Sequence, residues 1–390
     1  MRKEYSEIIE LANKNNCTDV FSWSKYKTYK DDRYSYFLKY IKKVPPDRFD
    51  GIYTKSGSDI HECVEEFYQG KLDHKGMLGK YEDLLFENTL AGLKYDRTDE
   101  EKNEKIGNKY EDCIRHFLLH HNKIPYDIKL EEFIGIVVED IYFQGYIDAY
   151  HIEKRDDMNK VIITDWKSSS IYKGDKYEKE KGQLLLYIEG MHQKGVPYEK
   201  IIGRWNFLKY VDVTVTQKAV DKETKQHKTK VRTLERNNYV EKLKTSIIMW
   251  LKQSKMFDGD IDEMIDKCIF ENSLDSLPDD VKDKFMVDDC YVEVSFTEQD
   301  IIDLKSDIVE TVKSIRETTL EYNNTQDEML WWQDVTDNSS YFMANLSEYS
   351  SALHKPYAKY LEEREMFLNE ENKTTTDDED ILSLLDDILD

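Results

Sequence analysis

Two apolar runs flank a polar stretch in the middle of the chain. β-Branched and aromatic residues dominate residues 137–152 and again 161–166, and the segment between them, 153–160, is mostly polar. Such runs are typical of β-strands, and a short polar segment between two of them is typical of a hairpin turn. The pattern predicts two antiparallel strands joined near residue 157.

The centre of this hairpin brings two acidic residues together. Asp148 and Asp165 are equidistant from a turn centred between Asp156 and Asp157, so we expect them to face each other across the two strands. Side chains alternate along a strand, and Lys167 therefore shares a face with Asp165. Two carboxylates and one ammonium group are predicted to meet at one place.

Facing carboxylates need positive charge between them. Lys167 supplies part of it, and a hard divalent cation such as Mg²⁺ or Mn²⁺ would supply the rest. Residues 177–194 then form a predicted helix that ends before Gly195, with Gln183 and Tyr187 four apart on one face, where they could reach a bound phosphate or nucleobase. The competing interpretation is a solvated strand face, since an Asp and a Lys two apart are a weak signal by themselves.

The same reasoning predicts further elements on both sides of the hairpin. Apolar spacing favours helices at residues 3–13, 60–70, 81–93, 101–120, 239–254 and 298–321, and strands near 130–133, 200–215 and 291–296. Glu131 or Glu132, at the start of the first of these strands, could be an outer acid of the site. Together the elements predict an α/β protein with a central mixed sheet, wrapped by helices from both ends of the chain.

Three histidines lie at the end of the predicted helix 101–120. His116, His120 and His121 suggest a metal site, but histidines near the C-terminus of a helix more often stabilise its last carbonyls. We favour the second interpretation.

The composition bears on the number of domains, the location of the protein and its cysteine chemistry. With 390 residues, of which 39% are hydrophobic and 35% charged, the chain can bury the core of one large domain or of two ordinary ones. It has no apolar run of membrane-spanning length, and residues 1–5 are not followed by the apolar core of a signal peptide, so we expect a cytoplasmic protein with no membrane partner. The five cysteines include no C-x-x-C pair, which argues against a disulfide framework and a zinc site.

The formal net charge of −24 is unusual for a protein that binds nucleic acid, because phosphate contacts supply much of the affinity. Local charge matters more than the total, and residues 209–252 hold eleven Lys or Arg against five Asp or Glu. This segment is the best candidate for a strip that faces DNA. A solvated, exposed β-ribbon or loop over residues 218–236 is an equally good interpretation.

The last residues of the sequence differ from the rest. Residues 377–390 hold seven acids, no basic residue and an apolar stripe at helical spacing, after a polar linker at 372–376. We predict that this acidic tail docks in a groove on a protein partner, such as a single-strand-binding protein, a helicase or a recombinase. The alternative is a disordered segment that only solvates the chain.

Three motifs around the hairpin resemble those of one family. Gly145-Tyr146-Ile147-Asp148, Asp165-Trp166-Lys167 and Gln183-Leu184-Leu185-Leu186-Tyr187 look like the core of the PD-(D/E)XK nucleases, in the branch that includes RecB-type nuclease domains and CRISPR-associated exonucleases. That branch adds a histidine from an upstream helix, and residues 57–67 fit its context. The resemblance implies the fold of that family, a restriction-endonuclease-like sheet, with helical N- and C-terminal additions here.

The resemblance also implies a role for each residue of the motifs. The metal ligands for Mg²⁺ or Mn²⁺ would be His61, Asp148, Asp165 and the carbonyl of Trp166. Lys167 would be the catalytic lysine, and Gln183 and Tyr187 would help to hold the DNA. Without the resemblance, a single histidine on a helix is more often a packed side chain than a ligand.

Iron–sulfur members of the family carry cysteines at places where this chain has other residues. Asp31-Asp32 stand near one such position, and Met343, Ser347 and His354 stand where three clustered cysteines would be. Hydroxyl and thioether groups do not replace thiolates on iron, so we expect no iron–sulfur cluster. Packing of aromatic side chains would close this part of the fold instead, namely Trp331, Trp332, Phe342, Tyr349 and Tyr357.

The expected organisation has four parts. They are an N-terminal helical part carrying His61 (1–130), the nuclease core (131–215), a basic and helical part that packs on the core (216–370) and the acidic tail (371–390). The expected activity is that of a metal-dependent exonuclease acting on single-stranded DNA or on duplex ends in recombination, repair or replication. Two alternatives stay open: a structure- or sequence-dependent DNA endonuclease, and a non-catalytic acidic protein that recruits DNA-processing partners.

Overall fold

The computed structural model describes residues 2–46, 51–332, 345, 348–349 and 366. Contacts divide the chain into two compact units, one made of residues 1–23 and 52–309 and the other of residues 24–51 and 310–390. Neither unit is continuous in sequence. The four-part division expected above follows the order of the chain and stays a prediction.

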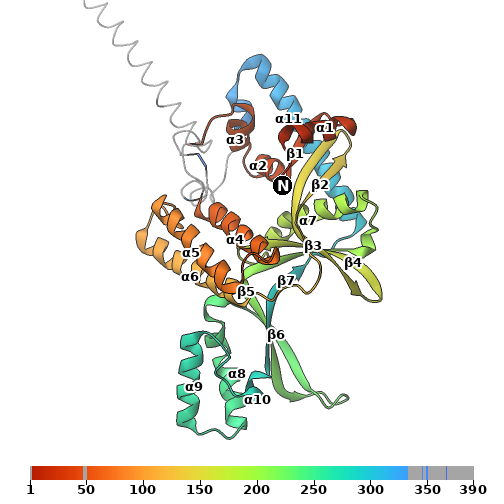
Figure 1. The fold of residues 1–390 in the computed structure, drawn as a ribbon. Coiled ribbons are helices and arrows are strands. Elements are labelled where there is room, and N and C mark those ends of the chain that lie inside the picture. The colour runs from red at the N-terminus through yellow and green to blue at the C-terminus, as the bar shows by residue number, and fades with distance from the viewer. Residues whose placement is uncertain (1, 47–50, 333–344, 346–347, 350–365, 367–390) are drawn as a thin grey trace, which may run out of the picture. The chain divides into compact units, whose positions relative to one another are not determined.

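A mixed seven-stranded sheet forms the centre of the first unit (Figure 1). Its strands are β1 (Asp19–Ser22), β2 (Lys129–Val138), β3 (Ile141–Arg155), β4 (Met158–Lys167), β5 (Ile201–Val220), β6 (His227–Glu235) and β7 (Phe285–Glu293). The order is β1-β3-β4-β5-β6, with β2 paired to β3 and β7 paired to β5. β1 is parallel to β3 and β4 is parallel to β5, and the other pairs are antiparallel. The predicted mixed sheet is confirmed.

The hairpin of β3 and β4 has the predicted centre. Its turn consists of Asp156 and Asp157, with φ of +48° and +61°. Pairing runs from Arg155 opposite Met158 to Ala149 opposite Thr164. Two positive φ values in a two-residue loop match the twist of the flanking strands, and Asp adopts this conformation more readily than most residues other than glycine.

The strand boundaries predicted around this hairpin are wrong in two respects. Residues 137–152 are not one strand, because β2 ends at Val138, Glu139 turns the chain with a φ of +52°, and β3 begins at Ile141. The eight-residue polar turn shrinks to two residues, since both strands continue through its polar positions. Polar residues on an exposed ribbon carry no burial pattern, so their sequence did not distinguish strand from turn.

Helices cover both faces of the sheet. Those of the first unit are α1 (Tyr5–Lys14), α4 (Ile52–Tyr68), α5 (His74–Leu90), α6 (Glu100–His120), α7 (Asp175–Gln193), α8 (Tyr239–Gln253), α9 (Asp258–Glu271) and α10 (Asp279–Lys282). Side chains of α4, α5 and α6 share a buried apolar cluster with Trp166 of β4. α7 packs on the other face, where Ile188 lies against Gly203 of β5. The site residues of β3 and β4 therefore lie between α4 and α7 (Figure 1).

A second apolar core lies at the far end of β5. The first part of β5 pairs with β4, up to Phe207 opposite Lys167. On its other side β5 pairs with β7, at residues 204–206 and again from Val211, and from Tyr210 it pairs with β6. The face holding Val211, Val213 and Val215 is covered by α8, α9 and α10. Strand β5 thus extends from the centre of the sheet to its far end, between β6 and β7.

The second unit contains α2 (Trp23–Asp31) apart from its first residue, α3 (Arg33–Tyr36) and the π-helical turn Phe37–Ile41. Helix α11 (Glu298–Thr325) contributes residues to both units. Trp331 is fully buried here, stacked on Phe37 at 5.6 Å. Asp32, at one predicted departure from iron–sulfur relatives, caps α3 by accepting from the backbone amides of Tyr34 and Ser35. Tyr349 donates to the carbonyl of Val44. Phe342, Met343, Ser347, His354, Tyr357 and the acidic tail lie outside the described residues.

Several boundaries differ from the sequence expectation. α4 and α5 begin earlier than predicted, at Ile52 and His74, and β7 spans Phe285–Glu293 rather than 291–296. α11 begins at Glu298 as predicted, where Thr297 and Asp300 cap each other's backbone amides. None of the helices in the described ranges combines the length and the apolarity needed to cross a membrane.

Candidate active site

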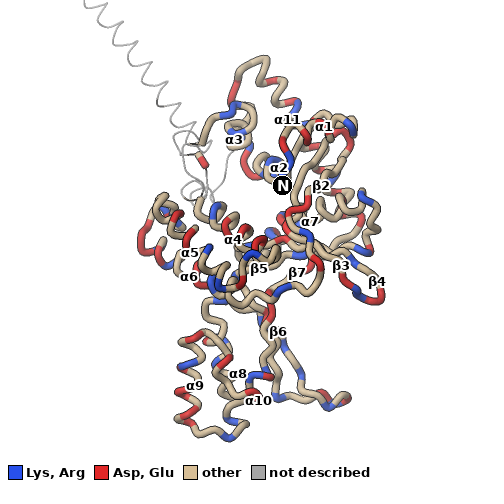
Figure 2. Tube along the Cα trace, in the orientation of Figure 1, with Lys and Arg blue, Asp and Glu red and all other residues tan. Residues whose placement is uncertain are grey.

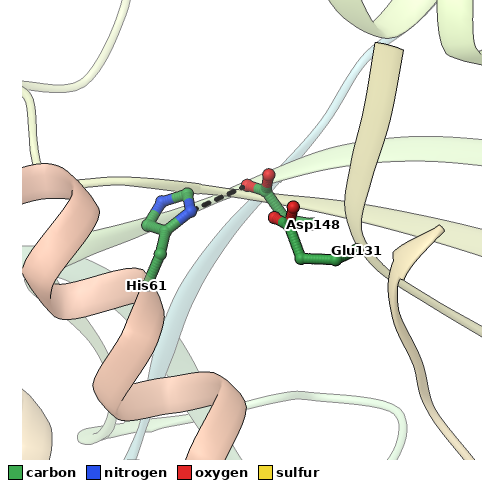
Figure 3. Close-up of side chains that lie close together, drawn as sticks. All are labelled: His61, Glu131 and Asp148. Atoms are coloured by element: carbon green, nitrogen blue, oxygen red, sulfur yellow. Dashed lines mark ion pairs between the residues drawn. The ribbon is translucent and has the colours of Figure 1, made fainter. Parts of the chain in front are cut away.

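His61, Asp148 and the peptide group of Trp166 form a compact set of contacts. The Nδ1 atom of His61 lies 3.8 Å from Oδ2 of Asp148, and its Nε2 atom lies 3.1 Å from the carbonyl oxygen of Trp166. The same Oδ2 of Asp148 accepts a hydrogen bond of 2.9 Å from the amide of Trp166. The backbone N–H and C=O groups of Trp166 thus contact Asp148 and His61, respectively. Figure 3 shows the His61 side chain of α4 directed at the Asp148 carboxylate.

Glu131 of β2 joins this group. Among the described residues, ligand atoms of His61, Glu131 and Asp148 all lie within 4.8 Å of one another (Figure 3). Glu131 has a φ of +46°, and the pairing of β2 with β3 passes over Glu131 and Asp148. A left-handed backbone at a residue other than glycine is costly and concentrates at functional sites. Arg2, 3.1 Å from the Glu131 carboxylate, is an exposed partner and contributes little.

The acids of three neighbouring strands, β2, β3 and β4, lie at matching distances from the turns that join these strands. Glu131 and Asp148 are equidistant from the turn at residues 139–140, just as Asp148 and Asp165 are equidistant from the turn at 156–157. The sequence reasoning named Glu131 only as an optional outer acid. The same counting rule would have selected it, had the break between β2 and β3 been recognised.

Lys167 lies at the other side of the site, in a chain of polar contacts. Its Nζ is 2.7 Å from Oδ2 of Asp165 and donates to Oε1 of Gln183 at 3.2 Å. Gln183 in turn donates to the hydroxyl of Tyr187 at 3.0 Å. Asp165 and Tyr187 are both buried, with relative exposures of 1% and 6%. Gln183 and Tyr187 therefore hold Lys167 in the structure. The DNA contact expected from the resemblance stays a prediction.

Burial and charge act on the two groups in opposite directions. Burial raises the pKa of Asp165 to about 6, with Lys167 opposing the shift and the charge of Asp148 adding to it. Burial alone would lower the pKa of Lys167, but Asp165 and Asp148 more than offset it and raise that pKa above its ordinary value. Lys167 is therefore a fixed cation between two acids.

Gly145 explains how α7 approaches the hairpin so closely. A Cβ atom at this position would lie 2.8 Å from Cε1 of Tyr187, closer than such contacts occur. Glycine therefore lets the tyrosine ring lie directly on β3 and bring its hydroxyl to Gln183.

Another acid, Glu65, lies one helical turn after His61 on α4. Burial raises the pKa of the Glu65 carboxyl, and the charge of Glu131 adds to the shift. The sequence reasoning did not name Glu65.

The donor set fits a hard divalent cation. It combines carboxylate oxygens, one imidazole and one backbone carbonyl, which suit Mg²⁺ or Mn²⁺. The 3.1 Å contact between His61 Nε2 and the Trp166 oxygen is a hydrogen bond, in which the ring nitrogen donates. It orients the ring so that Nδ1 lies 3.8 Å from Oδ2 of Asp148. Asp165 does not belong to the compact group of three, because its carboxylate is turned to Lys167.

A buried polar network supports the site from behind. The ring of Trp166 is stacked on Tyr68 at 6.1 Å, and the Tyr68 hydroxyl is 2.8 Å from Nε2 of His121. His121 is 2.7 Å from Asp289 through Nδ1, and Asp289 also pairs with Arg236. Each of these last three residues is nearly inaccessible to solvent.

The interpretation of the histidine cluster needs a correction. His121 binds Asp289 and Tyr68 rather than the carbonyls at the end of α6. The histidine that does meet such a carbonyl is His74, 2.9 Å from the oxygen of His121. The rings of His116 and His120 are in tilted contact at 4.4 Å. Burial lowers the pKa of His116 to about 3, with the nearby charge of Arg236 adding to the shift. None of the three cluster histidines belongs to the metal-type group found among the described residues.

Comparison with known proteins identifies one family. The model of the PD-(D/E)XK nuclease superfamily matches residues 20–268, which include His61, the hairpin and α7. No curated protein matches the chain.

Proposed function

The chain belongs to the PD-(D/E)XK nuclease superfamily, and we propose that it hydrolyses phosphodiester bonds in DNA with the help of Mg²⁺ or Mn²⁺. One observation carries the proposal. His61 and Asp148 lie together and contact the backbone of Trp166, and the next residue, Lys167, is held beside Asp165. Metal-type donors and a fixed cation are thus adjacent, as phosphodiester hydrolysis requires.

The residues have distinct roles in this proposal. The groups that would hold the metal are His61, Asp148 and Glu131, whose ligand atoms lie together. The resemblance of the motifs adds Asp165 and the carbonyl of Trp166 to this proposed set. When bound, the ion lowers the pKa of a water molecule and polarises the phosphate. Lys167 orients that water or stabilises charge that grows on the phosphate.

Gln183 and Tyr187 are positioning residues in this scheme. They act through Lys167, because the hydrogen bonds from Lys167 to Gln183 and from Gln183 to Tyr187 restrict the ammonium group to the side of Asp165. A lysine side chain has considerable rotamer entropy, and fixing it before the reaction lowers the cost of using it.

We further propose that the enzyme is an exonuclease that degrades single-stranded DNA or duplex ends in recombination, repair or replication, with a protein partner bound through residues 377–390. The resemblance of the sequence motifs to RecB-type nucleases supports this part. A circular single-stranded substrate distinguishes it from an endonuclease, because an enzyme that needs ends leaves the circle intact. Deleting residues 377–390 should preserve hydrolysis and abolish binding of the partner.

The decisive experiment uses end-labelled single- and double-stranded DNA, incubated with Mg²⁺, with Mn²⁺ or with a chelator. We expect hydrolysis with either ion and none with the chelator. Asp165→Asn should reduce the rate by at least about 10²-fold. Asp157→Asn is the matched control, because it makes the same change at an exposed turn position of the same hairpin. Equal rates for the two variants would show that the site is misassigned.

A further inference from the structure

The ribbon formed by β5 and β6 carries an unusual charge. Residues 217–232, which we call the basic ribbon, hold six Lys or Arg and two Asp or Glu, in a chain with a formal net charge of −24. Every residue from 222 to 230 is exposed. Figure 2 marks the Lys and Arg positions along this ribbon in blue. The two interpretations left open by the sequence are therefore compatible, since the segment is both an exposed ribbon and locally basic.

The cations of the basic ribbon have no acidic partners within the part of the chain that the structure describes. They are Lys218, Lys222, Lys225, Lys228, Lys230 and Arg232. Elsewhere in the same unit, Lys80 pairs with Glu62 and Glu66, and Arg115 pairs with Glu82. Two acids near the ribbon have other partners: Asp221 accepts from two amides of its own turn, and Glu235 pairs with Lys109. Glu223, the other acid of the ribbon, is exposed and forms no ion pair with these cations in the described part of the chain. An acidic protein that leaves these cations unpaired presents a site for a polyanion.

The spacing of the cations suits a repeating phosphate chain. Lys228, Lys230 and Arg232 alternate along β6 and therefore project from one face, about 6.7 Å apart. It is the face that also carries Val213 and Val215, and on it Lys228 and Lys230 are exposed and Arg232 is half-buried. This distance is about twice the axial spacing of phosphates along one strand of B-DNA, about 3.4 Å. Each of the three cations can therefore meet a separate phosphate.

The basic ribbon is also connected to the active site through one strand. Phe207 of β5 lies opposite Lys167, and Val215 of β5 lies opposite Lys230. Eight residues of extended strand span about 27 Å, the length of about eight base pairs of B-DNA. One nucleic acid of moderate length can thus contact both places.

We propose that the basic ribbon is an arm that binds the phosphate backbone of the nucleic acid whose end is hydrolysed at the active site. This inference rests on the proposed nuclease function for the identity of the polyanion. It adds a second contact, remote from the chemistry, that supplies affinity without reading sequence, because side-chain cations meet only phosphate.

Binding in chelator tests the arm without any hydrolysis. The probes are a fluorescent duplex of about 24 base pairs, the corresponding single strand, and a short DNA hairpin of about six base pairs that cannot span both contacts. The test variant is Lys228→Gln/Lys230→Gln/Arg232→Gln. The control variant, Lys75→Gln/Lys105→Gln/Lys267→Gln, removes the same total charge from exposed positions outside the ribbon.

We expect the ribbon variant to lose affinity for the long duplex by on the order of 10²-fold at 0.1 M salt. The slope of log K against log salt should fall by about 2.7 for the duplex or by about 2.1 for the single strand, whichever is the ligand. The short hairpin and the control variant should show much smaller changes. Thermal unfolding of both variants checks that the fold is intact.

Two results would overturn the arm: equal affinity of wild type and ribbon variant for both long probes, or an equal loss in the control variant. The nuclease proposal fails separately, through absence of metal-dependent hydrolysis in the wild type. With hydrolysis present, the ribbon variant should keep its rate on the short hairpin and lose kcat/KM on the long substrate.

Discussion

Asp289 is the residue at which the stability of the fold can be tested most sharply. It is 4% exposed and binds three groups: Arg236 through Oδ1, and through Oδ2 both the His121 ring at 2.7 Å and the amide of Asn122 at 3.1 Å. The change Asp289→Asn removes the negative charge and turns one acceptor atom into a donor. If the remaining oxygen faces Arg236, the new amide group meets the backbone donor of Asn122.

The expected loss follows from these contacts. Hydrogen bonds that involve charged groups contribute about 1.5–3 kcal/mol each. Breaking one partner of a buried ion pair costs about 3–5 kcal/mol, because the other charge is left uncompensated. We expect Asp289→Asn to lower the free energy of unfolding by about 3–5 kcal/mol. Its neighbour Asp288 is exposed, and Asp288→Asn should be neutral or slightly stabilising since it removes a like charge beside Asp289 and Asp212.

Urea unfolding followed by tryptophan fluorescence measures the difference, and hydrogen exchange locates it at the end of α6 and in β7. Fluorescence is suitable because Trp166 is stacked on Tyr68 within the same network. A change of less than about 1 kcal/mol in Asp289→Asn, or an equal change in Asp288→Asn, would refute the reasoning.

The pH dependence has a definite sign. Burial pushes the pKa of Asp289 upward, but His121 and Arg236 more than offset this and hold it below its ordinary value. A depressed pKa contributes stability that is present above the unfolded-state pKa, about 3.9, and is lost as the pH falls through the folded-state value. The difference between wild type and Asp289→Asn should therefore stay constant from neutral pH to about pH 5 and shrink below about pH 4.

Three further predictions concern the active site. Glu131→Gln should raise the Mn²⁺ concentration needed for half-maximal activity by about 10-fold or more. Metal titration of the activity and direct measurement of Mn²⁺ binding check this. Titration curves that match the wild type would show that Glu131 is not a metal ligand. Gly145→Ala should lower the free energy of unfolding by about 1–3 kcal/mol and reduce kcat, because the new Cβ atom would displace Tyr187. The control Gly79→Ala, which has open space around it, should be neutral or stabilising in thermal unfolding. Tyr187→Phe removes the hydroxyl that accepts from Gln183 and should lower kcat without changing DNA affinity in chelator; a loss of affinity alone would assign Tyr187 to DNA contact instead.

The sequence alone determined the local features of the site. The centre of the hairpin followed from two apolar runs and a turn between two aspartates, which tolerate positive φ. The helix after the hairpin ends at Gln193, with Gly195 at a φ of +96°, close to its predicted limit. These features depend on neighbours within a few residues, whose preferences are visible as periodicity and turn chemistry.

The tertiary structure decided which distant groups meet. Glu131 joins the site because β2 pairs with β3. His121 contacts Asp289, which lies on β7, 168 positions later in the sequence. Tyr187 is buried on Gly145 and accepts a hydrogen bond from Gln183, a contact that the sequence did not reveal. The residue pattern of neither segment reveals such a partner. A buried polar group needs only one complementary atom, and any part of the folded chain can supply it.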